Sequence, residues 1–201
     1  MSLDHAILGF LNYCPISGYD LKKVFDISVR HFWSADQSQI YRTLARLAES
    51  GLVTCEVVEQ DSRPDRKVYF ITPKGREELH RWMNEPLVMQ PARSAPLIRV
   101  FFSGLEEDEN ALQYFRAGVE MMKAILKVYQ SIPEDLDNRI MQEIPQIRQI
   151  TPRDRFFWLL TLESGIENIR STLRWMESVI ERLERKDYTN RLSIEETLTE
   201  R

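Results

Sequence analysis

Hydrophobic residues near the N-terminus recur at helical spacing in three consecutive segments. This spacing predicts helices over residues 4–13, 17–32 and 35–50. The apolar residues of the third segment share one face, which should be buried: Ile40, Leu44 and Leu47. Ser34, with Gln37 three residues later, predicts a capping box at the start of this helix, and Gly51 suits its end.

After Gly51 the apolar positions change to a strand pattern. Residues 52–60, "LVTCEVVEQ", are rich in β-branched side chains, and residues 66–72, "RKVYFIT", alternate. The turn cluster "DSRPD" separates them, so we expect a β-hairpin. Thr72 and Pro73 then suit the start of a fourth helix. Three helices, a hairpin and a helix are the order of a winged helix-turn-helix, here over residues 1–85.

The second half of the chain carries a sustained heptad-like pattern. Residues 86–96 contain three prolines and are predicted to connect the first domain to a helical domain over 97–201. Apolar residues then alternate at intervals of three and four, at Leu159, Leu162, Ile166, Ile169, Leu173, Met176, Ile180 and Leu183. The helix predicted over 106–132 could cover this seam within the chain. The two helices together have more apolar face than one hairpin buries, so we also expect a homodimer through this coiled-coil-like region. The fold class is therefore mainly α with a small β-hairpin.

Charge and cysteine content narrow the function further. The chain has 27 basic and 31 acidic residues, a net charge of −4, which excludes a simple polycation. Residues 62–76 nevertheless carry five basic residues against one acidic residue. Cys14 and Cys55 lack the spacing of a metal site, and no segment is long and apolar enough to cross a membrane. We expect a cytoplasmic protein without a disulfide framework.

The sequence shows no pattern of an enzyme site. The three histidines lie far apart, and no nucleophile-elbow, zinc-protease or phosphate-binding motif occurs. We therefore predict no catalytic residue, no metal and no cofactor.

The polar face of the third helix has the composition of a base-reading surface. Arginine and glutamine match the edges of guanine and adenine in the major groove, and base contacts cluster near the start of a recognition helix. The candidate base contacts are Ser38, Gln39, Tyr41, Arg42, Thr43 and Arg46. The candidate phosphate contacts, on the preceding helix and the hairpin, are Lys22, Lys23, Arg63, Arg66 and Lys67. A solvated polar face would have a similar composition, and the position beside a basic hairpin favours DNA.

Several ordered stretches resemble the PadR family of bacterial transcriptional regulators. They are "AILGFLNYCPISGYDLKKVF", "WSADQSQIYRTLARLAESGLV", "RPDRKVYFITPKGREELHRWM" and "PLIRVFFSGL". The second half resembles the larger subgroup that includes virulence-gene activators. The resemblance implies DNA contacts from Gln39, Tyr41, Arg42, Arg63, Arg66 and Lys67. Many family members have proline where this chain has Arg42, so operator sequences do not transfer from relatives.

Aromatic and methionine side chains in the helical half suit an adaptable apolar pocket. The candidates are Trp158, Trp175 and Met122. Ordinary helix packing explains the same residues. The resemblance adds weight to a pocket, because some family members sense phenolic acids or drug-like molecules.

These observations together predict a sequence-specific transcriptional regulator. It would bind double-stranded DNA as a homodimer at a pseudo-palindromic operator, act as a repressor, and respond to a small apolar or aromatic effector. The alternative is a winged helix that binds another protein, which the overall acidic charge favours.

Overall fold

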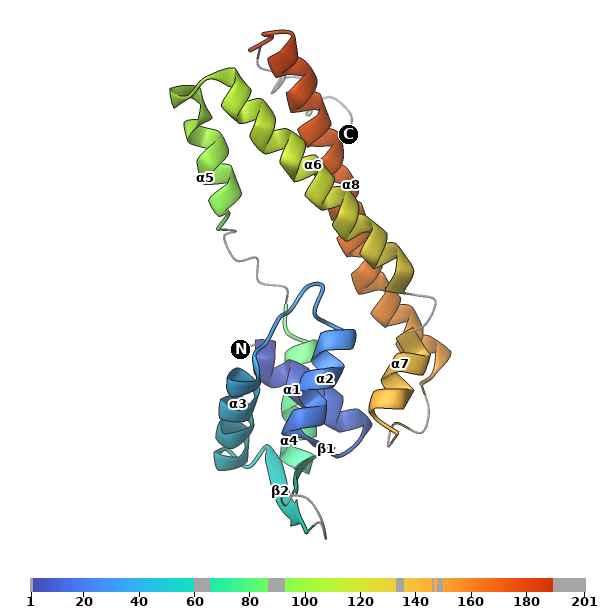
Figure 1. The fold of residues 1–201 in the computed structure, drawn as a ribbon. Coiled ribbons are helices and arrows are strands. Elements are labelled where there is room, and N and C mark those ends of the chain that lie inside the picture. The colour runs from blue at the N-terminus through green and yellow to red at the C-terminus, as the bar shows by residue number, and fades with distance from the viewer. Residues whose placement is uncertain are drawn as a thin grey trace. The chain divides into compact units, whose positions relative to one another are not determined.

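The computed structural model describes residues 2–59, 66–86, 93–132, 136–145, 147 and 150–189 (Figure 1). The chain forms two compact units. One combines residues 1–89 with 131–165, and the other combines 90–130 with 166–201. The predicted functional division at residues 86–96 stays a prediction. The packing adds a later segment, residues 131–165, to the first unit.

The first unit contains the predicted order of three helices, a hairpin and a helix. Its N-terminal elements are α1 (Ser2–Tyr13), β1 (Ile16–Ser17), α2 (Gly18–Ile27), α3 (Gln37–Glu49), β2 (Val53–Val58), β3 (Arg66–Ile71) and α4 (Pro73–Met83). The short strand β1 is an addition to the prediction. It pairs with β3, which makes an antiparallel sheet of order β1-β3-β2. In the hairpin, Val53 lies opposite Ile71 and Val58 lies opposite Arg66.

Capping side chains set the helix starts, with one shift from the prediction. Helix α3 begins at Gln37, and its capping box is made by Asp36 and Gln39 instead of Ser34 and Gln37. Its end is as predicted, because Gly51 has a φ of 69°. Helix α2 ends at Ile27, five residues before the predicted end. Residues 28–32 form turns instead of continuing the helix.

The core of the first unit confirms the predicted face of α3. Ile40, Leu44 and Leu47 are all buried and pack in one cluster with residues of α1, α2 and the sheet. Each of these side chains contributes about 1.5–3 kcal/mol of hydrophobic free energy when buried. Cys14 is buried at the edge of this core, whereas Cys55 is exposed on β2.

Helix α7 (Leu136–Glu143) and the first part of α8 (Pro152–Glu184) complete the first unit. Leu136, Ile140 and Ile144 are buried in the same core cluster as the N-terminal helices. Thr151 accepts a hydrogen bond from the Asp154 amide at 3.1 Å and so caps α8.

The second unit contains α5 (Ala95–Phe102), a 3₁₀ turn (Ser103–Leu105), almost all of α6 (Asp108–Ser131) and the later part of α8. Within it, the α8 seam packs on α6. Ile169, Leu173 and Met176 form a buried cluster with Phe115 and Val119, so α6 covers this part of the seam within the chain. Earlier seam residues Leu159 and Leu162 belong to the first unit.

Helix α5 is the exception in the second unit, since it has no buried residue. Among the described residues, no helix is long and apolar enough to span a bilayer.

Candidate nucleic-acid interface and apolar cavity

Five of the six predicted base contacts lie on the exposed face of α3. They are Ser38, Gln39, Tyr41, Arg42 and Arg46. Thr43 differs, because only 6% of its surface is exposed and its side chain lies on the packed face of α3. This burial argues against the base contact that the sequence analysis predicted for Thr43.

Gln39 is already engaged by the capping box. Its side-chain oxygen accepts a hydrogen bond from the Asp36 amide at 3.0 Å, and the Asp36 carboxylate accepts one from the Gln39 amide at 2.7 Å. The capping bond occupies one of the two acceptor lone pairs of the Gln39 side-chain oxygen and leaves its N–H donors available to a base.

Arg42 extends along its own helix, with its Nε donating to the Ser38 carbonyl at 3.3 Å. This contact is long and involves an exposed side chain, so it is easily exchanged for a base edge.

Several predicted DNA-contacting cations are paired with acidic side chains of the same chain. Lys23 donates to Glu143 of α7 at 2.9 Å, and Arg46 contacts Asp4 of α1 at 2.5 Å. Two further ion pairs join Lys22 to Asp26 and Arg66 to Asp20. Such surface pairs add little stability, so DNA phosphates can compete with the carboxylates for these cations.

The two remaining wing candidates are Lys67 and Arg63. Lys67 is exposed on β3. Arg63, a predicted wing contact, lies outside the described residues.

Tyr41 positions α3 against the start of α2. A Cβ added at Gly18 would lie 2.6 Å from the Tyr41 ring, so a larger residue there would force that ring to move. The base-reading role predicted for Tyr41 is thus combined with a packing role.

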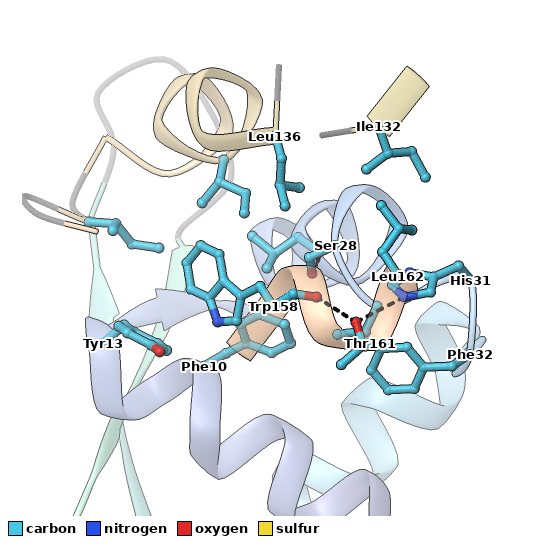
Figure 2. A pocket seen from close by; sticks show the side chains of 14 residues that line it. Phe10, Tyr13, Ser28, His31, Phe32, Ile132, Leu136, Trp158, Thr161 and Leu162 are labelled. Carbon is cyan, nitrogen blue, oxygen red and sulfur yellow. Dashed lines mark hydrogen bonds between the residues drawn. The ribbon is translucent and has the colours of Figure 1, made fainter. Parts of the chain in front are cut away.

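An apolar cavity of about 120 Å³ lies within the first unit (Figure 2). Its wall is built from α1, the end of α2 and the turns after it, α7, and the first part of α8. In Figure 2 Tyr13 and Trp158 lie on one side and His31 and Phe32 on the other. The wall also includes aliphatic side chains, Val24, Val29, Ile132, Leu136, Ile140, Ile147 and Leu162.

The polar groups of this wall are hydrogen-bonded within the protein. His31 Nε2 lies 3.0 Å from Thr161 Oγ1, and that hydroxyl donates to the Trp158 carbonyl at 2.7 Å. Burial lowers the pKa of His31 below its ordinary value. The Tyr13 hydroxyl donates to Asp154 at 2.9 Å, and burial together with this bond raises the pKa of Tyr13 to about 12.

The three predicted effector residues fall in different clusters. Trp158 lines the cavity. Trp175 and Met122 belong to the second unit, where the Trp175 ring lies edge-on to Phe115 at a centroid distance of 5.6 Å and Met122 packs against the buried cluster. Sequence spacing missed Phe10, Tyr13, His31 and Phe32, which the fold brings to one wall. We find no periodic signal that could have joined them.

The fold and the exposed face of α3 together define the class of protein to which this chain belongs. A winged helix-turn-helix presents an exposed polar recognition helix beside a basic hairpin, and long helices follow it. The transcriptional regulator PadR-like family matches residues 7–81, and the virulence activator alpha C-terminal family matches residues 92–184.

Whole-chain relatives agree with these matches. A probable transcriptional regulator of Mycobacterium tuberculosis is 33% identical and aligns over 92% of this chain and all of its own length. The negative transcriptional regulator PadR of Bacillus subtilis is 27% identical over 89% of this chain and 95% of its own. The chain therefore belongs to the PadR-like family and is a DNA-binding transcriptional regulator, not an enzyme.

Solved structures show the same architecture. Bacillus subtilis PadR in complex with operator DNA has a TM-score of 0.77 and 27% identity, covering 91% of this chain and 99% of that one. The same regulator in complex with p-coumaric acid has a TM-score of 0.71 and 25% identity, covering 92% and 99%.

Proposed function

We propose that this regulator is a repressor that binds a pseudo-palindromic operator as a homodimer and is released by a small apolar effector. The observation that carries the proposal is the exposed face of α3, with Arg42 at its centre, beside a basic hairpin in a fold shared with an operator-bound relative. The name of the Bacillus subtilis relative, a negative regulator, supports repression. Because its target is the bacterial chromosome, we place its action in the cytoplasm.

Each recognition helix reads bases in a major groove. Ser38, Gln39, Arg42 and Arg46 face outward for this role, with Tyr41 at the edge of the face. Phosphate contacts come from α2 and the wing, through Lys22, Lys23, Arg63, Arg66 and Lys67. Binding should therefore weaken steeply as salt concentration rises.

The homodimer uses apolar surface that the single chain leaves exposed. Helix α6 already covers Ile169, Leu173 and Met176 of the α8 seam. Exposed apolar residues remain on α5, the turn after it and α6, at Leu97, Ile98, Phe101, Phe102, Leu105, Met121 and Val128. A second copy would bury these side chains, since exposed apolar surface of this kind marks interaction sites.

The cavity of the first unit is the proposed effector site. Its wall includes Val24, which directly follows Lys22 and Lys23 in α2. A ligand that changes the position of α2 would therefore also change the position of these cations. The p-coumaric acid complex of Bacillus subtilis PadR supports a small aromatic effector.

In-vitro selection from a random duplex library tests the DNA-binding part of this proposal. We expect the full chain to enrich one site made of two related half-sites, with centres about 34–36 Å or a multiple apart. The absence of any enriched sequence would contradict operator binding and favour a protein-binding winged helix. Enrichment of a single, unrepeated half-site would contradict the homodimer.

A further inference from the structure

The size of the cavity restricts what it can hold. Its volume is about 120 Å³. An apolar cavity of about 150 Å³ in another protein remains dry and binds benzene. The cavity described here therefore suits a molecule with one ring, held by contact with the aromatic wall of Phe10, Phe32 and Trp158.

The hydrogen-bonding groups of the wall are engaged with one another. The Ser28 hydroxyl donates to the Val24 carbonyl at 2.6 Å, and the Thr161 hydroxyl donates to the Trp158 carbonyl at 2.7 Å. The His31 ring interacts with both Ser28 and Thr161. A ligand would have to break these bonds to gain strong polar contacts of its own, so its binding must come mainly from apolar burial.

The electrostatics of the cavity oppose an anionic ligand. Among the described lining residues the one basic side chain is His31, and burial favours its neutral form. The nearby Tyr13 hydroxyl is bonded to the Asp154 carboxylate, which adds a negative charge at that side. Arg155, also near the start of α8, is paired with Asp137 at 2.8 Å. Among the described lining residues, a carboxylate would lose its hydration without gaining a cationic partner.

We propose that this cavity selects uncharged, single-ring aromatic molecules and excludes carboxylates. The inference rests on the proposed role of the cavity as an effector site and names the chemical class of the ligand. It also separates this chain from the relative whose structure contains p-coumaric acid, because that ligand carries a carboxyl group.

A pair of ligands of similar size that differ in charge tests the proposal. Benzyl alcohol and benzoate each have one ring and one oxygen-bearing carbon, but only benzoate is charged at neutral pH. In isothermal titration calorimetry with the full chain, benzyl alcohol should bind, and benzoate should bind about ten-fold more weakly or not at all, because a charge is costly to bury. Equal or tighter binding of benzoate would overturn the charge preference, and no binding of benzyl alcohol would overturn the ring site.

A charge introduced into the wall should reverse this preference. Thr161 lines the cavity and is partly open to solvent, so Thr161→Lys can be accommodated and would supply a cation. We expect the ratio of benzoate to benzyl alcohol affinity to rise about ten-fold. The matched control is Thr172→Lys on the same helix in the second unit, which should leave the ratio unchanged. An unchanged ratio in a folded Thr161→Lys protein would mean that the ligands bind elsewhere.

The same ligands separate this inference from the proposed function. If benzyl alcohol binds but does not release the selected DNA, the ligand class stands and the effector role fails. If the protein selects no DNA, the binding ratios still decide the ligand class.

Discussion

Arg42 is the residue on which sequence preference should depend most. Its exposed guanidinium is held by one long contact to the Ser38 carbonyl, so it can reach a base edge at little cost. We expect Arg42→Ala to weaken binding to the preferred site by about 1–3 kcal/mol and to relax preference at one position of each half-site. Fluorescence anisotropy against the selected site and its single-base variants measures both effects.

Lys67→Ala is the control for Arg42→Ala. Since Lys67 would contact a phosphate, its loss should weaken all sequences alike and reduce the salt slope by about 1. If Arg42→Ala behaves in the same way as Lys67→Ala, Arg42 contacts the DNA backbone and does not read bases.

Gly75 is required by a close approach between α4 and the chain before β2. A Cβ at this position would lie 2.1 Å from the Leu52 carbonyl oxygen, and backbone cannot move aside cheaply. We expect Gly75→Ala to lower the free energy of unfolding by about 1–3 kcal/mol, the usual cost of overpacking. Urea denaturation followed by circular dichroism measures this change.

Gly9→Ala gives the opposite expectation in the same experiment. A Cβ at Gly9, within α1, meets no atom within 4 Å. Because alanine is the better helix former, stability should rise by about 0.5–1 kcal/mol. Equal effects of the two substitutions would contradict the steric argument at Gly75.

At the residue scale, sequence reasoning identified which side of α3 faces outward but not what each side chain does there. The buried seam of Ile40, Leu44 and Leu47 follows from helical period alone. The capping role of Gln39 and the burial of Thr43 depend on where α3 begins and what packs beside it. Both properties depend on tertiary contacts, which a helical wheel does not show.

Helix α2 takes part in two of the proposed activities. Val24 lines the cavity, while Lys22 and Lys23 are predicted phosphate contacts. Helix α7 packs against α2, and its Glu143 holds Lys23. The Lys23–Glu143 pair therefore links an element of the cavity wall directly to a side chain that is predicted to contact DNA.

Removing the Glu143 charge should strengthen binding to any duplex. In Glu143→Gln the Lys23 ammonium no longer has a carboxylate competing with phosphate, so affinity should rise for specific and random sequences alike. If Lys23 then neutralises one more phosphate, the slope of log K against log salt should steepen by about 0.9. Anisotropy titrations at several salt concentrations give both values.

Glu120→Gln serves as the control for the total charge. Glu120 lies on α6 in the second unit, where it pairs with Lys123. It should change neither affinity nor slope by a comparable amount. A similar gain in both variants would show that overall charge, and not the Lys23 pair, governs binding.

At the element scale, strong local sequence signals were sufficient to predict where a helix begins. Weak local signals were not sufficient to predict a short strand or the end of a helix. The start of α4 was predicted from Thr72, whose hydroxyl does cap the helix. Strand β1 has only two residues and exists because β3 offers it a partner, so no local pattern could reveal it. Helix α2 ends early, although the apolar spacing continues beyond it.

At the scale of the whole molecule, α5 is the main reason to expect a second copy. Phe101 is 81% exposed and Leu105 is 82% exposed, which is unusual for such large apolar side chains. We therefore expect Phe101→Glu to convert the proposed homodimer into a monomer without unfolding the chain, because the side chain is hardly buried in a single copy. Analytical ultracentrifugation and circular dichroism measure these two properties.

Phe156→Glu is the matched control for the dimer. Phe156 is also an exposed phenylalanine, but it lies on α8 in the first unit, outside the proposed surface. A monomer in both variants would indicate a nonspecific effect of the added charge. A dimer in both would place the interface elsewhere.

The bounds of the two compact units could be predicted only in part from the order of segments along the sequence. A boundary near residues 86–96 follows from proline content, but the return of residues 131–165 to the first unit depends on side chains such as Leu136 and Ile140 packing into a distant core. The α8 seam looked like one continuous interface. Its apolar residues are shared between two cores because the period of a helix does not specify its partner.

The contrast between the two cysteines has a practical consequence for spectroscopy. Cys14 is buried, and burial raises the pKa of its thiol, so it should react slowly with maleimides. Cys55 is exposed on β2 within the hairpin. A nitroxide should therefore attach at one place per chain without any engineered cysteine. In a dimer, the two labels would let pulsed electron resonance follow how far apart the wings lie as ligand and DNA are added.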